Sequence, residues 1–211
     1  PMADGPVIQR SSARALRNDC AVKEILQMIG EVRRQTEVPI VLFNYYNPLL
    51  QFGLERLARE AARAGVDGVL VTDLAPEESA EFQKALSARQ IDMIYRVAPT
   101  STDDRLRRIA ARANGFIYAV SRTGVTGTRN ESSQDAERLV TRLRALTNLP
   151  VAVGFGISNK AQVEEVLRYA DAAVVGSAIV AEIEKQSGSQ DLVSNVGALV
   201  RSLTGALTVS V

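Results

Sequence analysis

Glycine and hydroxyl residues at the ends of three apolar runs are the part of this sequence best suited to chemistry. The first run, 115–120, leads into Ser121-Arg122-Thr123-Gly124-Val125-Thr126-Gly127. The second leads into Gly154-Phe155-Gly156-Ile157-Ser158, and the third into Gly176-Ser177. Glycine lets main-chain N–H groups approach a ligand closely, and successive N–H groups form a concavity that suits an anion. One such loop is as consistent with a surface turn as with phosphate binding, but three consecutive loops favour a phosphoryl group.

Helix starts are predicted directly after the second and third of these loops. Asn159 and Gln162 have the spacing of a capping pair, and residues 179–183 have a helical composition. A helix N-terminus has free N–H groups and the positive end of the helix dipole, and both favour bound phosphate. The loops after the last strands of a (β/α) barrel are the usual place for such a site.

The absence of histidine narrows the possible chemistry. Without histidine, Ser-His-Asp and Cys-His nucleophile systems and histidine-ligated zinc sites are excluded. Cys20 is the single cysteine, has no neighbouring ligands, and is expected to be an ordinary thiol. Proton transfer must therefore depend on carboxylates, tyrosine or water.

Composition indicates one globular domain that does not bind nucleic acid. The 211 residues are 46% hydrophobic and 5% aromatic, with a formal net charge of +1. There is neither a basic stripe nor an aromatic stacking surface for nucleic acid. No run approaches the ~18 apolar residues of a membrane span, and the N-terminus does not have the pattern of a signal peptide. We therefore expect a cytoplasmic protein.

Predicted strands alternate with predicted helices along the chain. The strands cover 39–46, 66–71, 91–97, 115–120, a run from 149 and a run from 172, and the first two helices cover 21–37 and 53–64. Pro76-Glu77-Glu78 is expected to open a third helix, and Thr100 to Asp104 to cap a fourth. The opening residues 1–9 are expected to be a loop in which Asp4-Gly5-Pro6 forms a turn carrying a carboxylate.

Strands that are apolar almost throughout indicate a parallel sheet covered by helices, either as a barrel or as a doubly wound sheet. Polar residues favour the barrel, because they gather at the C-terminal ends of the strands, where a barrel has its mouth. These residues are Asn44, Tyr45, Asn47, Asp73, Arg96, Ser121 and Ser177. A closed barrel needs eight strands and six are readable, so we expect either two strands upstream or an open sheet.

Several motifs in the same order give the chain a specific resemblance to a known family. Residues 1–6, Pro-Met-Ala-Asp-Gly-Pro, are similar to a loop of the form Pro-Leu-Ala-Asp-Gly-Pro in that family, and the agreement extends through 38–48, 64–68, 98–101, 121–127 and 154–158. On these motifs the chain resembles the α subunit of tryptophan synthase over nearly its whole length. That family is a (β/α)8 TIM barrel of the α/β class. The resemblance therefore implies that residues 1–211 form a single barrel domain with six parallel strands, incomplete at its N-terminus.

The resemblance implies a lyase in tryptophan biosynthesis that cleaves indole-3-glycerol phosphate to indole and glyceraldehyde 3-phosphate, a retro-aldol step. An aldolase can stabilise its carbanion through a lysine Schiff base or a divalent metal. Neither is expected here, because there is no histidine and the lysines lie in helical or helix-start segments: Lys23, Lys84, Lys160 and Lys185. Indole can accept the electrons once its C3 is protonated, so acid–base catalysis by carboxylates suffices without a metal or cofactor in this chain.

The resemblance also implies roles for individual residues. Asp4 would bind the indole N–H and stabilise positive charge on the ring; its alternative is closing the Asp-Gly turn. Tyr118 would lie beside the substrate, or alternatively be a core aromatic. Phe43 and Tyr45 would line the indole pocket. Asp73 would face the active-site mouth and partner surface. A second catalytic group, a glutamate, would precede Pro1.

For the phosphate and its surroundings, the resemblance implies main-chain and hydroxyl contacts from the three glycine-bearing loops. The phosphate-binding residues would be Thr126, Gly127, Gly156, Gly176 and Ser177, while Phe155 would form a wall of the pocket. Residues 124–133 would form a lid over the substrate. Thr72 and Ala75 stand where many relatives have proline, so that loop is expected to be looser here.

The resemblance implies an α2β2 heterotetramer in which the β subunit uses pyridoxal phosphate to condense indole with serine. The loops around Asp4 and residues 47–51 would face that partner. Two alternatives remain open from the sequence. One is another sugar-phosphate-binding barrel enzyme, such as an isomerase. The other is a catalytically impaired fragment or a non-catalytic partner subunit.

Overall fold

The computed structural model describes residues 3–120, 129–154 and 156–205, which form an α/β fold with six parallel strands. The sheet has the order β1-β2-β3-β4-β5-β6, so each strand pairs with its neighbours in the sequence. The strands are β1 (Val41–Asn44), β2 (Gly68–Val71), β3 (Asp92–Val97), β4 (Ile117–Val120), β5 (Val151–Gly154) and β6 (Ala172–Val174). The prediction of six parallel strands alternating with helices is confirmed.

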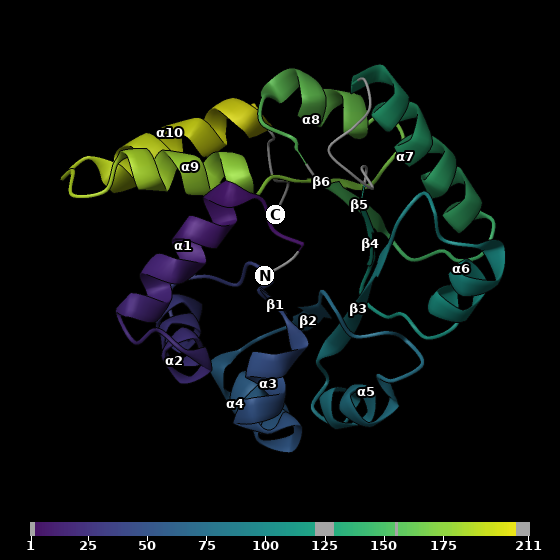
Figure 1. Ribbon diagram of the computed structural model, residues 1–211, viewed down its shortest axis with the longest axis horizontal. Helices are drawn as coiled ribbons and strands as arrows, with labels where there is room; N and C mark the ends of the chain where they lie inside the picture. The colour runs from purple at the N-terminus through teal and green to yellow at the C-terminus, as the bar shows by residue number, and fades with distance from the viewer. Residues whose placement is uncertain (1–2, 121–128, 155, 206–211) are drawn as a thin grey trace.

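The sheet curls and helices cover its convex side (Figure 1). Because β1 and β6 are the two edges of the sheet, the described strands form an open half-barrel. The helices are α1 (Pro6–Arg17), α2 (Val22–Arg33), α3 (Tyr46–Phe52), α4 (Leu54–Ala64), α5 (Ala80–Ser87), α6 (Asp103–Ala110), α7 (Arg129–Arg144), α8 (Lys160–Val166), α9 (Ser177–Lys185) and α10 (Leu192–Thr204). None of the helices in the described ranges is long and apolar enough to cross a bilayer.

Side chains alternate between the two faces of the sheet, and each face has its own apolar cluster. The convex face packs against the helices through Val69, Met93, Tyr95, Ile117 and Val151. The concave face, which faces the barrel interior, carries the buried residues Leu70, Ile94, Tyr118, Val120 and Ala152. Strands β2, β4 and β5 are buried along their whole length, as expected for strands with one face toward helices and the other toward a barrel interior.

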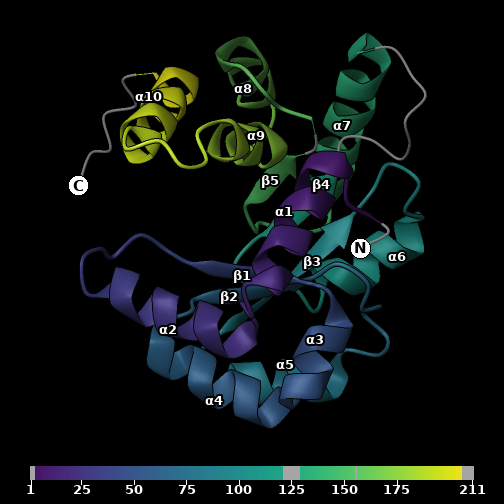
Figure 2. The same cartoon turned by 60° about the vertical axis from the view of Figure 1, so that its left-hand side comes forward.

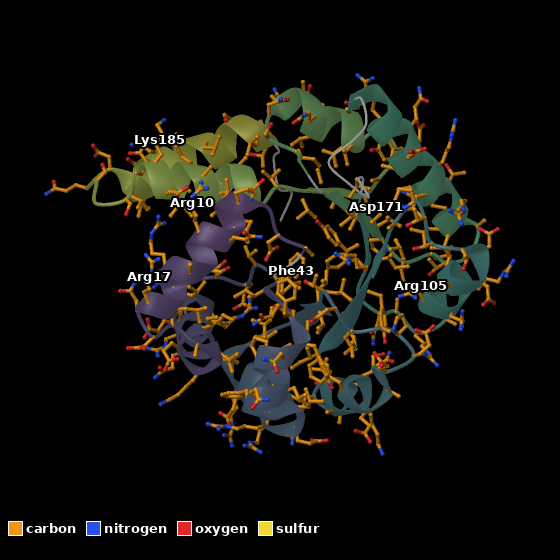
Figure 3. All side chains as sticks on the ribbon, viewed as in Figure 1. Arg10, Arg17, Phe43, Arg105, Asp171 and Lys185 are labelled. Atoms are coloured by element: carbon orange, nitrogen blue, oxygen red, sulfur yellow. The ribbon has the colours of Figure 1, made fainter. Side chains whose placement is uncertain are left out.

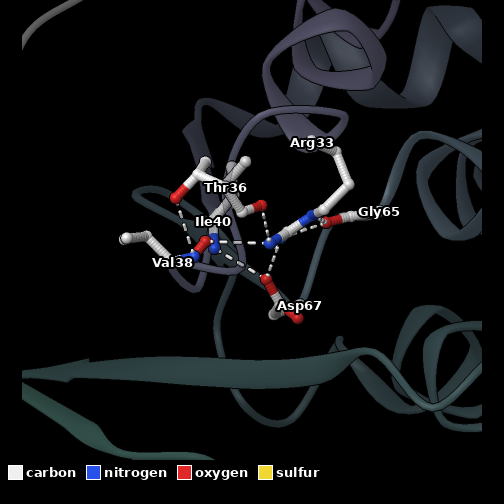
Figure 4. Close-up of polar contacts among 6 residues, drawn as sticks. All are labelled: Arg33, Thr36, Val38, Ile40, Gly65 and Asp67. Atoms are coloured by element: carbon white, nitrogen blue, oxygen red, sulfur yellow. Dashed lines mark hydrogen bonds and ion pairs between the residues drawn. The ribbon is translucent and has the colours of Figure 1, made fainter. Parts of the chain in front are cut away.

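At the N-terminal ends of the strands, which we call the base, polar side chains join neighbouring strands. Asp67 precedes β2 and accepts hydrogen bonds from the Ile40 N–H at 2.7 Å and from Arg33 at 2.5 Å (Figure 4). Arg33, in the last turn of α2, also donates to the carbonyl oxygens of Gly65 and Val38. One guanidinium therefore links α2 to the starts of β1 and β2.

A second aspartate makes similar contacts on the other side of the base. Asp171 precedes β6, accepts a hydrogen bond from the Val151 N–H at 2.8 Å, and pairs with Arg144 at the end of α7. The backbone hydrogen bond to Val151, helped by the Arg144 guanidinium, lowers the pKa of the Asp171 carboxyl. These contacts satisfy strand N–H groups and charged side chains together.

On the side of the ring opposite β3 and β4, α1 packs beside α9 (Figures 1 and 2). Arg10 donates two hydrogen bonds to the Glu184 carboxylate, at 2.9 and 2.8 Å, and Arg14 donates a third at 3.1 Å (Figure 3 labels Arg10). The hydrogen bond from Arg10 lowers the pKa of Glu184 to about 2. No residue of α1 is fully buried, and these ion pairs join the helix to α9.

Three local predictions were wrong. Residues 6–17 form α1 instead of continuing a loop, because Gly5 and Pro6 occupy the N-cap and first position of a helix. The predicted strand 39–46 ends at Asn44, and α3 begins at Tyr46. Helix α5 begins at Ala80 and not at Pro76, since the Pro76 carbonyl oxygen accepts hydrogen bonds from the Ser79 hydroxyl and from Arg112.

Candidate functional site

One corner of the mouth, the C-terminal end of the strands, brings together three predicted site residues. Tyr45 follows β1, and its hydroxyl accepts a hydrogen bond from the Ala3 N–H at 3.0 Å, which holds the loop of Asp4 against this strand end. Asp73 follows β2 and accepts a hydrogen bond from the Tyr46 N–H at 2.6 Å. The structure therefore places two carboxylates, Asp4 and Asp73, around one phenol.

The electrostatics of this corner follow from burial and charge. Burial raises the pKa of the Tyr45 phenol, and the carboxylates of Asp4 and Asp73 add to the increase, while the hydrogen bond from Ala3 opposes it. Tyr45 consequently remains a neutral hydrogen-bonding group beside Asp4. Asp4 itself is half-buried, a position that leaves its carboxylate accessible to a ligand N–H.

An aromatic pair lies on the concave face next to this corner. The rings of Phe43 and Tyr118 meet edge to face, with centroids 5.9 Å apart and an interplanar angle of 71°. Phe43 is 53% exposed and Tyr118 is 8% exposed, so the pair extends from the open concave surface into the interior. Figure 3 shows Phe43 near the centre of the ring of helices. Two such rings are a suitable surface for a flat aromatic ligand.

Tyr118 reaches from β4 across to β5. A Cβ atom at Gly154 would overlap the hydroxyl and ring carbons of Tyr118, so only glycine at this position leaves room for the phenol. Burial raises the pKa of the Tyr118 phenol, and the positive charge of Arg96 partly offsets that increase. Tyr118 is thus both a buried aromatic residue and part of the concave surface.

The predicted phosphate-binding residues that the structure describes lie at the ends of β5 and β6. Gly156 is exposed and has a φ of +79°, which favours glycine. Gly176 is the N-cap of α9 and Ser177 its first residue, and no side chain caps this helix. The first N–H groups of α9 therefore have no side-chain acceptor, as an anion site requires.

The start of α8, which follows β5, has the predicted capping pattern. The Asn159 side chain accepts a hydrogen bond from the Gln162 N–H at 3.0 Å, and the Gln162 side chain accepts from the Ser158 N–H at 2.8 Å. The predicted residues Thr126, Gly127 and Phe155 lie outside the described residues, and so do residues 124–128 of the predicted lid. The roles of all the site residues stay predictions.

Arg96 is the mouth residue to which the sequence patterns assigned no role. It is near the end of β3 and is the register partner of Tyr118 on β4. Its signal in the sequence is a basic residue inside an otherwise apolar strand. Within the described ranges, no group of three or more histidine, cysteine, aspartate or glutamate side chains is placed to hold a metal ion.

Comparison with known proteins identifies relatives along nearly the whole chain. The family model described as "Tryptophan synthase alpha chain" matches residues 1–207. The tryptophan synthase alpha chain of Citrifermentans bemidjiense is 47% identical over 203 residues, which are 96% of this chain and 76% of that protein. The alpha chain of Roseiflexus sp. RS-1 is also 47% identical, covering 97% of this chain and 78% of its own length.

Solved structures give the same result for the fold. Tryptophan synthase subunit alpha from Legionella pneumophila has a TM-score of 0.86 at 32% identity, covering 96% of this chain and 76% of that one. A structure of the α2β2 tryptophan synthase complex from Pyrococcus furiosus has a TM-score of 0.88 at 37% identity, covering 97% and 82%. The half-barrel therefore corresponds to the greater part of these alpha-chain barrels.

Proposed function

The chain belongs to the tryptophan synthase alpha chain family and acts as a lyase in tryptophan biosynthesis, and from this membership we propose that it cleaves a carbon–carbon bond. The substrate is indole-3-glycerol phosphate, and the products are indole and glyceraldehyde 3-phosphate. The observation that carries the proposal is the corner of Asp4, Tyr45 and Asp73 beside the Phe43–Tyr118 pair. It offers a carboxylate and an aromatic surface to one ligand.

In the proposed reaction, a proton is added to C3 of the indole ring and positive charge develops at the ring nitrogen. Asp4 accepts a hydrogen bond from the indole N–H and stabilises that charge. The bond between C3 and the glycerol chain then breaks. Its electrons restore the aromatic ring, and the adjacent hydroxyl loses its proton to become the aldehyde. Proton transfer needs a further acid–base group, for which we expect the glutamate implied by the resemblance.

The aromatic and phosphate ends of the substrate would bind at different strands. Phe43, Tyr45 and Tyr118 would hold the indole ring near β1 and β4. The phosphate would bind at the other side of the mouth, where Gly156 and the uncapped start of α9 offer main-chain N–H groups. This separation orients the bond to be broken between the carboxylate corner and the strand ends of β5 and β6.

We further propose a β subunit as the partner, in an α2β2 complex like that of the Pyrococcus furiosus relative. Pyridoxal phosphate would be bound by the β subunit and no cofactor by this chain. The loop of Asp4 and residues 47–51, the latter within α3 at the mouth, would face the partner. The cytoplasm stays the predicted location.

The experiment is to incubate the full-length protein, including the segment that carries the expected glutamate, with indole-3-glycerol phosphate, with and without a β subunit, and to measure indole and glyceraldehyde 3-phosphate. We expect equal amounts of both products and faster release with the β subunit present. Absence of indole under both conditions would contradict the proposal. Conversion of another sugar phosphate in the same assay would instead support the alternative of a different phosphate-binding barrel enzyme.

A further inference from the structure

Arg96 is the only basic residue in the six strands that the structure describes. The other strand residues are apolar apart from Asn44, Asp92, Tyr95 and Tyr118. Arg96 is also the one exposed residue of β3, so its guanidinium is open to solvent and to a ligand. The orientation and partners of Arg96 therefore decide what it does.

Arg96 faces the barrel interior. Its neighbour Tyr95 points to the convex side, where its hydroxyl lies 2.7 Å from the Ser79 hydroxyl at the start of α5. Since successive strand residues face opposite sides, Arg96 shares the concave face with Ile94. The register agrees, because Arg96 is the partner of Tyr118, which belongs to the concave cluster together with Ile94.

The Arg96 guanidinium has no acceptor among the described residues. The two predicted site carboxylates of the mouth do not pair with Arg96: Asp73 accepts from the Tyr46 N–H, and Asp4 lies beside Tyr45. By contrast, Arg33 and Arg144 at the base both pair with aspartates. Arg96 thus has unused hydrogen-bond donors inside a concave surface that is otherwise mostly apolar.

Small side chains and Tyr118 separate Arg96 from the phosphate side of the mouth. Tyr118 pairs in register with Ala152, and Ala152 pairs with Ala172, so small side chains follow on β5 and β6. Gly154, one inward-facing position farther along β5, is covered by the Tyr118 phenol, which therefore lies between Arg96 and the ends of β5 and β6. Beyond these residues lie Gly156 and the start of α9.

We propose that Arg96 binds the phosphate group of the substrate from inside the barrel, as a side-chain anchor that complements the main-chain N–H groups at the strand ends. The ligand class is a phosphomonoester, and the proposal rests on the proposed function for the identity of the natural substrate. A guanidinium suits this task because it can donate two parallel hydrogen bonds to one phosphate. Arg96 would also place positive charge opposite the carboxylate corner, so that the two ends of the substrate are distinguished by charge.

The test measures the affinity of the chain for glycerol 3-phosphate by calorimetry in four forms: wild type, Arg96→Leu, Arg96→Lys and Arg89→Leu. Arg89 lies in the turn after α5 and its substitution removes the same charge outside the mouth. We expect Arg96→Leu to weaken binding about tenfold or more, since it removes a charge-assisted hydrogen-bond donor. Arg96→Lys should have an intermediate affinity, because lysine keeps the positive charge but cannot donate two parallel hydrogen bonds. Arg89→Leu should have the affinity of wild type.

Inorganic phosphate serves as a second probe, because it shares the anion but lacks the glycerol chain. Weakening of both ligands by Arg96→Leu would support an anchor for the phosphate itself. Equal affinity of wild type and Arg96→Leu for glycerol 3-phosphate would overturn the proposal, and so would a failure of wild type to bind it. A circular dichroism melt of each variant establishes that it is folded.

Failure of this proposal is distinguishable from failure of the proposed function. In the indole-release assay, Arg96→Leu should raise KM for indole-3-glycerol phosphate more than it lowers kcat. If wild type released no indole yet bound glycerol 3-phosphate in an Arg96-dependent way, the reaction would be wrong and the phosphate anchor would stand. If wild type released indole and Arg96→Leu had the same KM, the anchor would be wrong and the reaction would stand.

Discussion

The two ends of the sheet use polar side chains in opposite ways. At the base, Asp67 and Asp171 each accept a strand N–H and pair with an arginine from the preceding helix. At the mouth, Asp4 is half-buried beside a phenol and Arg96 has no acceptor among the described residues. Charges at the base are thus neutralised within the chain, whereas charges at the mouth remain available to a ligand.

Residues that stabilise the fold therefore lie at the base of the sheet, and residues that are available for binding lie at its mouth. A satisfied ion pair that also closes backbone hydrogen bonds contributes to folding. An unpaired charge held by neighbouring elements contributes instead to binding, because its partner arrives with the ligand. Substitutions at the two ends should therefore have separable consequences.

The largest effect is expected at the mouth, from Asp4→Asn. Removing the negative charge should reduce kcat for indole release about a hundredfold or more, because the ring nitrogen loses its stabilising charge as the transition state forms. Unfolding free energy should change by less than about 0.5 kcal/mol, as for an ordinary surface position. Steady-state kinetics and denaturant unfolding measure the two quantities.

Glycerol 3-phosphate binding is the control for Asp4→Asn and should be unchanged, since the ligand lacks an indole ring. Near-normal indole release by this variant would contradict the role of Asp4. A loss of stability instead of activity would mean that the mouth resembles the base, and the contrast between the two ends would fail.

A smaller effect, on stability and not on ligand binding, is expected at the base from Arg33→Ala. The substitution leaves the carbonyl oxygens of Gly65 and Val38 and the Asp67 carboxylate without a shared donor. We expect the free energy of unfolding to fall by about 2 kcal/mol, in the range for hydrogen bonds to charged groups. Affinity for glycerol 3-phosphate should be unchanged.

The matched control for Arg33→Ala is Arg108→Ala, which removes an exposed arginine paired with Asp104 and Glu77 on the surface. An exposed ion pair contributes little, so a loss of less than about 1 kcal/mol is expected. Equal losses in the two variants would show that the base contacts are ordinary surface pairs.

The smallest effect concerns the α1–α9 contact, which belongs to neither end. The pKa of Glu184 is lowered from 4.5 to about 2, chiefly by the hydrogen bond from Arg10. Its folded-state pKa lies below its unfolded value, so the pairing stabilises the fold above pH 4.5 and is lost as the pH falls toward 2. Carboxyl resonances followed by NMR should titrate in that range, and Arg10→Ala should move the Glu184 pKa back toward its ordinary value.

In that titration Glu60 is a suitable internal comparison, since it is half-buried like Glu184 and its pKa is lowered by the neighbouring Arg59. Arg10→Ala should leave the titration of Glu60 unchanged. A Glu184 pKa that is the same with and without Arg10 would mean that α1 is not attached through this pair.

Much of the fold could be predicted from the sequence, because strands covered on both faces are apolar along their length. Val69 to Val71 and Val151 to Val153 are of this kind, and both were placed in parallel strands. Capping at Asn159 and Thr102 was equally readable, since a cap depends on residues three positions apart. Local patterns of this sort need no knowledge of distant contacts.

The features that the sequence did not reveal depend on contacts between distant segments. Helix α1 has no fully buried residue, and its attachment to Glu184 joins residues 174 positions apart. Pro76-Glu77-Glu78 was predicted to open a helix, but α5 begins at Ala80, after Ser79, which contacts Tyr95 on a distant strand. Arg96 was noticed as polar, but its position beside Tyr118 is visible only when β3 and β4 are aligned in register.

The pairing of α1 with α9 also has a consequence for the order of folding. During synthesis, the helix that carries Arg10 leaves the ribosome 174 residues before Glu184. Contacts between residues so far apart in sequence form late, because closing a long loop costs entropy before any contact is gained. The nascent chain can therefore assemble the β-α units between the two helices first and dock α1 against α9 later, so this docking is expected to be the slow step.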